Sequence, residues 1–133
     1  MLTFEGVTMR LGAWGWSLAV CAVLLSGSAF AVSLSSSLKN YYAEFEIVLE
    51  CEVKEHLSTA EADAAEAAID KIEDYFLAKD SSINTESLQK KAVADKNEGL
   101  RIMARSGGGL TPYCRQSLRE LLTKAKEIGP AAQ

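Results

Sequence analysis

The sequence predicts an all-α protein, a small domain of four helices closed by one disulfide, behind an N-terminal signal peptide. Three observations support this prediction. A capping box from Ser58 to Glu61 precedes a long stretch with helical spacing of apolar residues. A Thr-Pro pair opens a second such stretch at residues 111–128. Beyond the leader, Cys51 and Cys114 are the two cysteines that remain, which permits a single pairing within the chain.

Residues 1–31 have the pattern of a secretory signal peptide. A positive charge precedes an apolar run over residues 11–25, and an A-x-A motif predicts cleavage between Ala31 and Val32. Met9 is an alternative start. The apolar run is shorter than the roughly 20 residues that a membrane span needs, although an uncleaved anchor is the alternative. We therefore expect a secreted or periplasmic protein without stable membrane insertion after leader removal.

The rest of the chain divides into three parts. Residues 32–37 are rich in serine, which is typical of a flexible lead-in. Residues 38–129 carry the helical patterns and have the length of one domain. Residues 130–133 form a short tail after a Gly-Pro stop signal.

The two remaining cysteines are expected to pair. In an exported chain two cysteines normally form a disulfide, and free thiols are the alternative. A bond between Cys51 and Cys114 would close a loop of about 63 residues. The chain-entropy model gives such a loop a stabilisation of about 4 kcal/mol.

Residues 38–57 are predicted to form the first helix, although their pattern is ambiguous. On a helix, one stripe holds Leu38, Tyr41, Tyr42, Phe45, Val48, Leu49 and Val53, while Ile47 and Cys51 fall outside it. On a strand, residues 41–53 alternate apolar and acidic side chains, which makes an α+β fold the alternative. Nothing downstream reads as a pairing strand, so that alternative requires pairing with another copy in a homodimer. We therefore prefer the helix.

Two further helices follow. The helix at residues 59–79 is the clearest, with apolar residues on one face and acidic residues on the other. Asn84 can cap a third helix over residues 85–105. Its apolar stripe is broken, and Gly99 weakens a helix interior, which indicates a bend or two shorter helices.

The last helix is predicted to begin after a Gly-rich turn and to end at residue 128. Thr111 is expected to cap it, with Pro112 at the first helical position. One face is expected to be buried, and it carries Cys114, Leu118, Leu121, Leu122, Ala125 and Ile128.

Charge is distributed unevenly along the chain. Residues 32–80 carry 4 basic and 12 acidic side chains, net −8, and residues 81–133 carry 9 basic and 5 acidic side chains, net +4. The two halves are expected to complement each other when they fold together. The net charge of −4 argues against nucleic acid as a partner.

The sequence offers no set of residues for catalysis. His56 is the single histidine, and pairing of Cys51 would remove the nearest nucleophile. His56 is expected to be a surface residue at the end of the first helix. No C-x-x-C, H-E-x-x-H or Walker motif occurs, and straight rows of helical carboxylates do not converge on a cation. We therefore expect no enzyme activity, no cofactor and no metal site.

A row of basic residues at the last helix is the candidate binding site. Arg115, Arg119 and Lys126 follow the Gly-rich turn and share one flank of the helix. Arginine side chains near a helix N-terminus favour anionic groups such as carboxylates. We therefore expect this row to dock an acidic protein partner.

The stretch from Leu110 to Lys126 holds a Thr-Pro pair, a cysteine and an amphipathic helical pattern. In this it resembles the second half of the HdeA-type acid chaperones, over about a sixth of the chain beyond the leader. Cys51 departs from that family, in which the first cysteine opens a helix. Periplasmic immunity proteins against secreted amidases share the architecture of leader, helices and one bridge. Both likenesses are analogies of architecture.

We therefore expect a small exported protein that binds another protein, as an accessory, inhibitor or immunity-type factor. The alternative, implied by the chaperone resemblance, is an acid- or stress-activated periplasmic chaperone that loosens and exposes apolar surface.

Overall fold

The computed structural model describes residues 34–130, which contain four helices and no strand. The all-α prediction is therefore confirmed, and the strand alternative for residues 41–53 is wrong because these residues are helical throughout. The predicted signal peptide, its cleavage residues Ala31 and Val32, and residues 131–133 lie outside the described residues. None of the helices in the described part is both long and apolar enough to cross a bilayer.

The first helix covers residues 34–53 of the described chain. Residues 34–37, expected in a flexible lead-in, are helical, because Leu34 packs against the core. The helix ends four residues earlier than predicted, in a turn where Glu55 has φ 62°. The backbone N–H groups of His56 and Leu57 both donate to the carbonyl of Cys51, at 2.9 and 3.3 Å, which closes the helix end.

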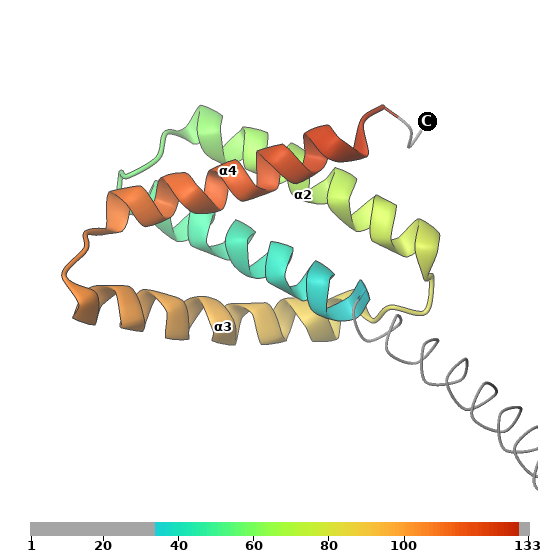
Figure 1. Cartoon of the computed structure of the whole chain (residues 1–133), viewed down its shortest axis with the longest axis horizontal. Coiled ribbons are helices and arrows are strands. Elements are labelled where there is room, and N and C mark those ends of the chain that lie inside the picture. The colour runs from blue at the N-terminus through green and yellow to red at the C-terminus, as the bar shows by residue number, and fades with distance from the viewer. Residues whose placement is uncertain (1–33, 131–133) are drawn as a thin grey trace, which may run out of the picture. The chain divides into compact units, whose positions relative to one another are not determined.

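The other three helices enclose the first one, which lies between α3 and the pair formed by α2 and α4 in Figure 1. Ser36, Asn40 and Val53 are its exposed residues within the described chain. Its buried side chains point in several directions around the axis, and they are Leu38, Tyr42, Ile47, Val48 and Cys51. This explains why Ile47 and Cys51 fall outside a single stripe. Val53, on that stripe, is the last residue of the helix and is 79 % exposed.

Helix α2 spans Thr59–Lys79, as predicted, and begins at the predicted capping box. The Ser58 hydroxyl accepts a hydrogen bond from the backbone N–H of Glu61, whose carboxylate accepts from the N–H of Ser58. Tyr42 of the first helix donates its hydroxyl hydrogen to Glu73 of α2 at 2.6 Å. Burial, together with this bond, raises the pKa of Tyr42.

Helix α4 spans Leu110–Ile128 and crosses α2, as Figure 1 shows. The buried face of α2 carries small side chains, namely Ala62, Ala65 and Ala68, which let a neighbouring helix approach closely. The predicted start of α4 needs correction, because Gly109 with φ 77° is the N-cap and Thr111 is already helical. Pro112 still lies in the first turn, where its missing N–H has no partner within the helix.

The disulfide joins the end of the first helix to the second turn of α4. Cys51 and Cys114 are bonded, with their Cα atoms 5.9 Å apart, and both are fully buried. The pairing predicted from the cysteine count is therefore present in the structure.

Helix α3 spans Thr85–Ser106 without interruption, so the expected bend at Gly99 is wrong. Its N-cap is Asn84, as predicted. It buries only Leu88 and Ala92. Ion pairs also attach α3 to the first helix, with Lys39 Nζ 3.0 Å from Asp95 and Lys96 Nζ 3.9 Å from Glu50. Helix α3 is thus the least embedded of the four helices.

Gly99 is a glycine because Tyr113 of α4 occupies the space beside it. A Cβ atom at Gly99 would lie 2.7 Å from the Tyr113 hydroxyl oxygen and 3.8 Å from the ring carbon that carries it. The residue that weakens the sequence pattern of α3 therefore permits a contact between α3 and α4.

We expect removal of the disulfide to lower the free energy of unfolding by about 4 kcal/mol, because the unfolded chain regains the entropy of a 63-residue loop. Urea denaturation of the Cys51→Ala, Cys114→Ala variant, followed by circular dichroism, measures this loss. A reducing agent should destabilise the native protein similarly and leave the double variant unchanged. Equal unfolding midpoints for the oxidised, reduced and substituted proteins would contradict the prediction.

We expect the effect of Gly99→Ala on stability to depend on Tyr113. In the native background, the new methyl group meets the Tyr113 hydroxyl and offsets the gain in helix propensity. In a Tyr113→Phe background, which removes that oxygen, Gly99→Ala should gain up to about 1 kcal/mol. A double-mutant cycle in urea measures the difference, and strict additivity of the two substitutions would refute the assigned contact.

Candidate functional site

The three basic residues that the sequence singles out lie along one side of α4. Arg115, Arg119 and Lys126 are spaced i, i+4 and i+11, which places them within one narrow arc of a helix. All three are exposed. The structure thus brings the predicted residues together on one surface.

Leu122 belongs to the same surface, seven residues after Arg115. It was predicted to be buried with the apolar face, but it is 39 % exposed. The helical spacing contains the signal, because at 100° per residue position 122 points within about 20° of Arg115 and about 40° of Lys126. We call Arg115, Arg119, Leu122 and Lys126 the α4 ridge.

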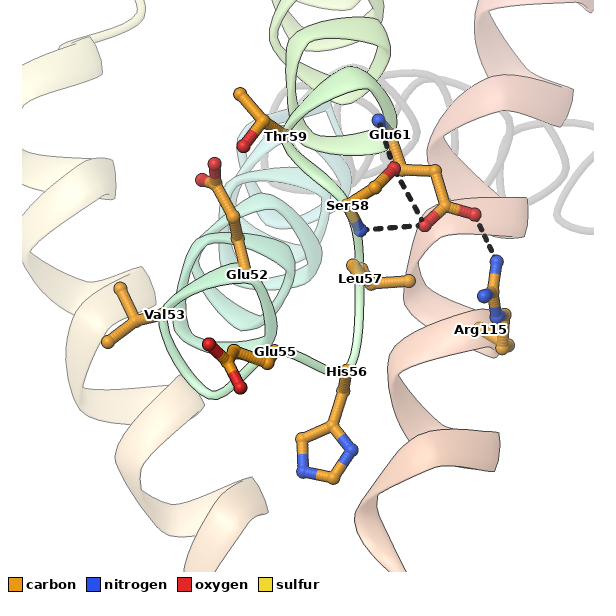
Figure 2. Close-up of a pocket in the computed structure, with 9 residues that line it drawn as sticks. All are labelled: Glu52, Val53, Glu55, His56, Leu57, Ser58, Thr59, Glu61 and Arg115. Carbon is orange, nitrogen blue, oxygen red and sulfur yellow. Dashed lines mark hydrogen bonds and ion pairs between the residues drawn. The ribbon is translucent and has the colours of Figure 1, made fainter.

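Arg115 differs from the rest of the ridge because it is held by α2. Its guanidinium donates to the carboxylate of Glu61, across the contact between the two helices (Figure 2). The backbone N–H of Ser58 and the guanidinium of Arg115 together hold the pKa of the Glu61 carboxyl below its ordinary value. Because Glu61 also caps α2, the start of that helix positions one end of the ridge.

The other cations of the ridge are available to a partner. Arg119 and Lys126 form no ion pair within residues 34–130. An exposed cation that lacks an internal counter-charge can pair with a carboxylate of another molecule.

An open cleft of about 720 Å³ adjoins the ridge at Arg115 (Figure 2). The end of the first helix, the turn after it and the start of α2 form its wall together with one residue of α4. Its lining residues are Glu52, Val53, Glu55, His56, Leu57, Ser58, Thr59, Glu61 and Arg115. Because the first helix ends at residue 53, His56 lies in this turn and not at a helix end. Its Nδ1 atom lies 2.8 Å from the Thr111 hydroxyl oxygen, which ties the turn to the start of α4.

Beside His56, the described residues present the Thr111 hydroxyl and no free thiol. Cys51, the nearest thiol in the sequence, is fully buried and bonded to Cys114. Among the described residues, no group of three His, Cys, Asp or Glu side chains is arranged to hold a metal ion.

We expect Glu61 to make the protein lose stability in acid. Since its folded-state pKa lies below the ordinary value of 4.5, its contribution is complete above about pH 4.5 and is lost as pH falls through the lower pKa. Urea midpoints measured from pH 7 downward should fall less steeply for Glu61→Gln than for the native protein. Glu66→Gln, at an exposed carboxylate of the same helix, is the control and should follow the native protein. Parallel decline of all three proteins would contradict the role given to Glu61.

Comparisons with known proteins find no matching family model, no similar curated protein and no similar solved structure.

Proposed function

We propose that this protein is exported and acts by binding another protein through the α4 ridge, as an accessory, inhibitor or immunity-type factor. One observation carries the proposal. The ridge combines an exposed apolar side chain, Leu122, with two exposed cations that have no counter-charge within the described residues. The other apolar residues predicted for α4 face inward, so Leu122 is available for an external contact.

The composition of the ridge suits a protein interface with an acidic partner. Interfaces commonly place apolar side chains at the centre, and charged groups at the rim steer the partner and fix its register. Leu122 lies between Arg119 and Lys126, which reproduces this order along one helix. Arginine is also enriched at interfaces, because its planar group binds carboxylates through two hydrogen bonds.

The buried disulfide supports export. Disulfides persist in secreted and periplasmic proteins and are rare in the reducing cytosol. The leader pattern at residues 1–31 points to the same compartments.

A second candidate function is the acid- or stress-activated chaperone, and the attachment of α3 favours it. Helix α3 buries little, and carboxylates of Asp95 and Glu50 contribute to both ion pairs that attach it to the first helix. Acidification to about pH 2 protonates carboxylates and removes these pairs, which would release α3 and uncover the first helix. Reversible binding of an apolar dye at that pH, with protection of client proteins, supports the chaperone, and an unchanged domain supports the binding protein.

We expect charge reversal on the ridge, Arg119→Glu with Lys126→Glu, to weaken partner binding by at least about tenfold, because it replaces attraction by repulsion. Affinity capture from the exported fraction of the source cells, followed by titration of the captured protein, measures this. The matched control is Lys91→Glu with Arg105→Glu, which changes the charge equally at exposed positions of α3. Equal affinity of both variants for the partner would end the proposal.

A further inference from the structure

We propose that the α4 ridge binds helix α2 of a second copy of this chain. The inference rests on the proposed function, since it names a partner for the same ridge. The surface that would receive the ridge is an acidic row on α2, formed by Asp63, Ala67, Asp70 and Asp74, and all four residues are exposed. We call this row the α2 stripe.

The spacing of the two surfaces matches when the helices run antiparallel. The ridge has its residues at i, i+4, i+7 and i+11, and the stripe has the same spacing. The apolar member stands third in the ridge and second in the stripe, so reversal of one helix aligns them. Antiparallel contact then gives the pairs Arg115 with Asp74, Arg119 with Asp70, Leu122 with Ala67, and Lys126 with Asp63.

The apolar pair permits the helices to approach each other. Ala67 is small, so the larger Leu122 side chain can fill the space above it, as ridges fill grooves in packed helices. The charged pairs then lie on either side of this contact. The arrangement has an apolar centre and a polar rim, which is the usual order of a protein interface.

The stripe cannot meet the ridge of its own chain. Helix α2 contacts its own α4 through other residues, since Glu61 pairs with Arg115 and Lys124 Nζ lies 5.5 Å from the Tyr75 ring centre. At 100° per residue, Glu61 and Tyr75 point about 120–160° away from Asp63. The three aspartates of the stripe form no ion pair within residues 34–130. Their charges therefore face outward.

The ridge–stripe contact joins unlike faces of two copies, so it does not close on itself. Helices α2 and α4 run the same way in one chain, as the colour order in Figure 1 shows. A two-fold axis perpendicular to both would bring each helix nearest to its own counterpart, so the ridge of one copy meets the stripe of the next in a head-to-tail contact that adds copies in series.

The contact is expected to be weak and sensitive to salt. Its ion pairs are exposed, and pairs of that kind contribute little individually and are screened by salt. Arg115 already pairs with Glu61 in its own chain, so Arg119 and Lys126 carry most of the attraction. Self-association should thus depend on these two cations.

Sedimentation equilibrium of the oxidised protein tests the proposal. We expect concentration-dependent self-association that begins with a dimer at about 20 mM salt, and a dissociation constant at least about tenfold higher at about 500 mM salt. The ridge variant Arg119→Glu with Lys126→Glu should be a monomer, and so should the stripe variant Asp63→Lys with Asp70→Lys. An equimolar mixture of the two variants should associate again, because the ridge of each variant then meets a stripe of opposite charge on the other.

Circular dichroism of each variant must match the native protein, and Lys91→Glu with Arg105→Glu must dimerise as the native protein does. A monomer at every salt concentration, a dimer that both variants retain, or a mixture that stays monomeric would overturn the inference. Any of these results, together with ridge-dependent capture of a different protein, would leave the proposed function in place. If the ridge variant also captures every partner as the native protein does, the proposed function fails as well.

Discussion

The enclosure of the first helix by the other three is the constraint on which this structure depends. Each neighbour contacts the first helix differently. The ring of Tyr41 packs against Phe76 of α2, with 6.2 Å between ring centres, and Lys39 forms an ion pair with Asp95 of α3. Cys51 is bonded covalently to Cys114 of α4. The covalent bond is the one contact here that thermal motion does not break. It fixes the second turn of α4 against the first helix, and thereby the direction in which the α4 ridge points.

The same constraint leaves the charged outer faces to act between molecules. Because α2 and α4 use their alanines and leucines against the core and each other, their acidic and basic rows remain at the surface. The contrast between an acidic first half and a basic second half is thus only partly cancelled inside the fold, by pairs such as Glu61 with Arg115. The acidic and basic side chains that are not paired within the fold are available for recognition, which is the physical basis of both binding proposals.

Local signals were readable from the sequence and contacts between distant residues were not. The start of α2 follows from a capping box whose members lie three residues apart. The disulfide follows because the two cysteines beyond the leader permit one pairing. The first helix was ambiguous because a helix with neighbours on several sides has no single apolar stripe, and a stripe is what helical pattern analysis detects. The bend predicted at Gly99 is wrong because the residue that requires a glycine there, Tyr113, lies on another helix. The pairing of Arg115 with Glu61 joins residues 54 positions apart, beyond any spacing rule.

Hydrogen exchange of the oxidised protein, resolved by residue, tests the central claim most directly. Amides deep in an enclosed element exchange only through global unfolding, whereas those of a loosely attached helix exchange through local opening. The structure predicts the slowest exchange in the first helix between Leu38 and Cys51, and faster exchange along the second half of α3. Exchange in the first helix that is as fast as in α3, or faster, would contradict its place at the centre of the fold.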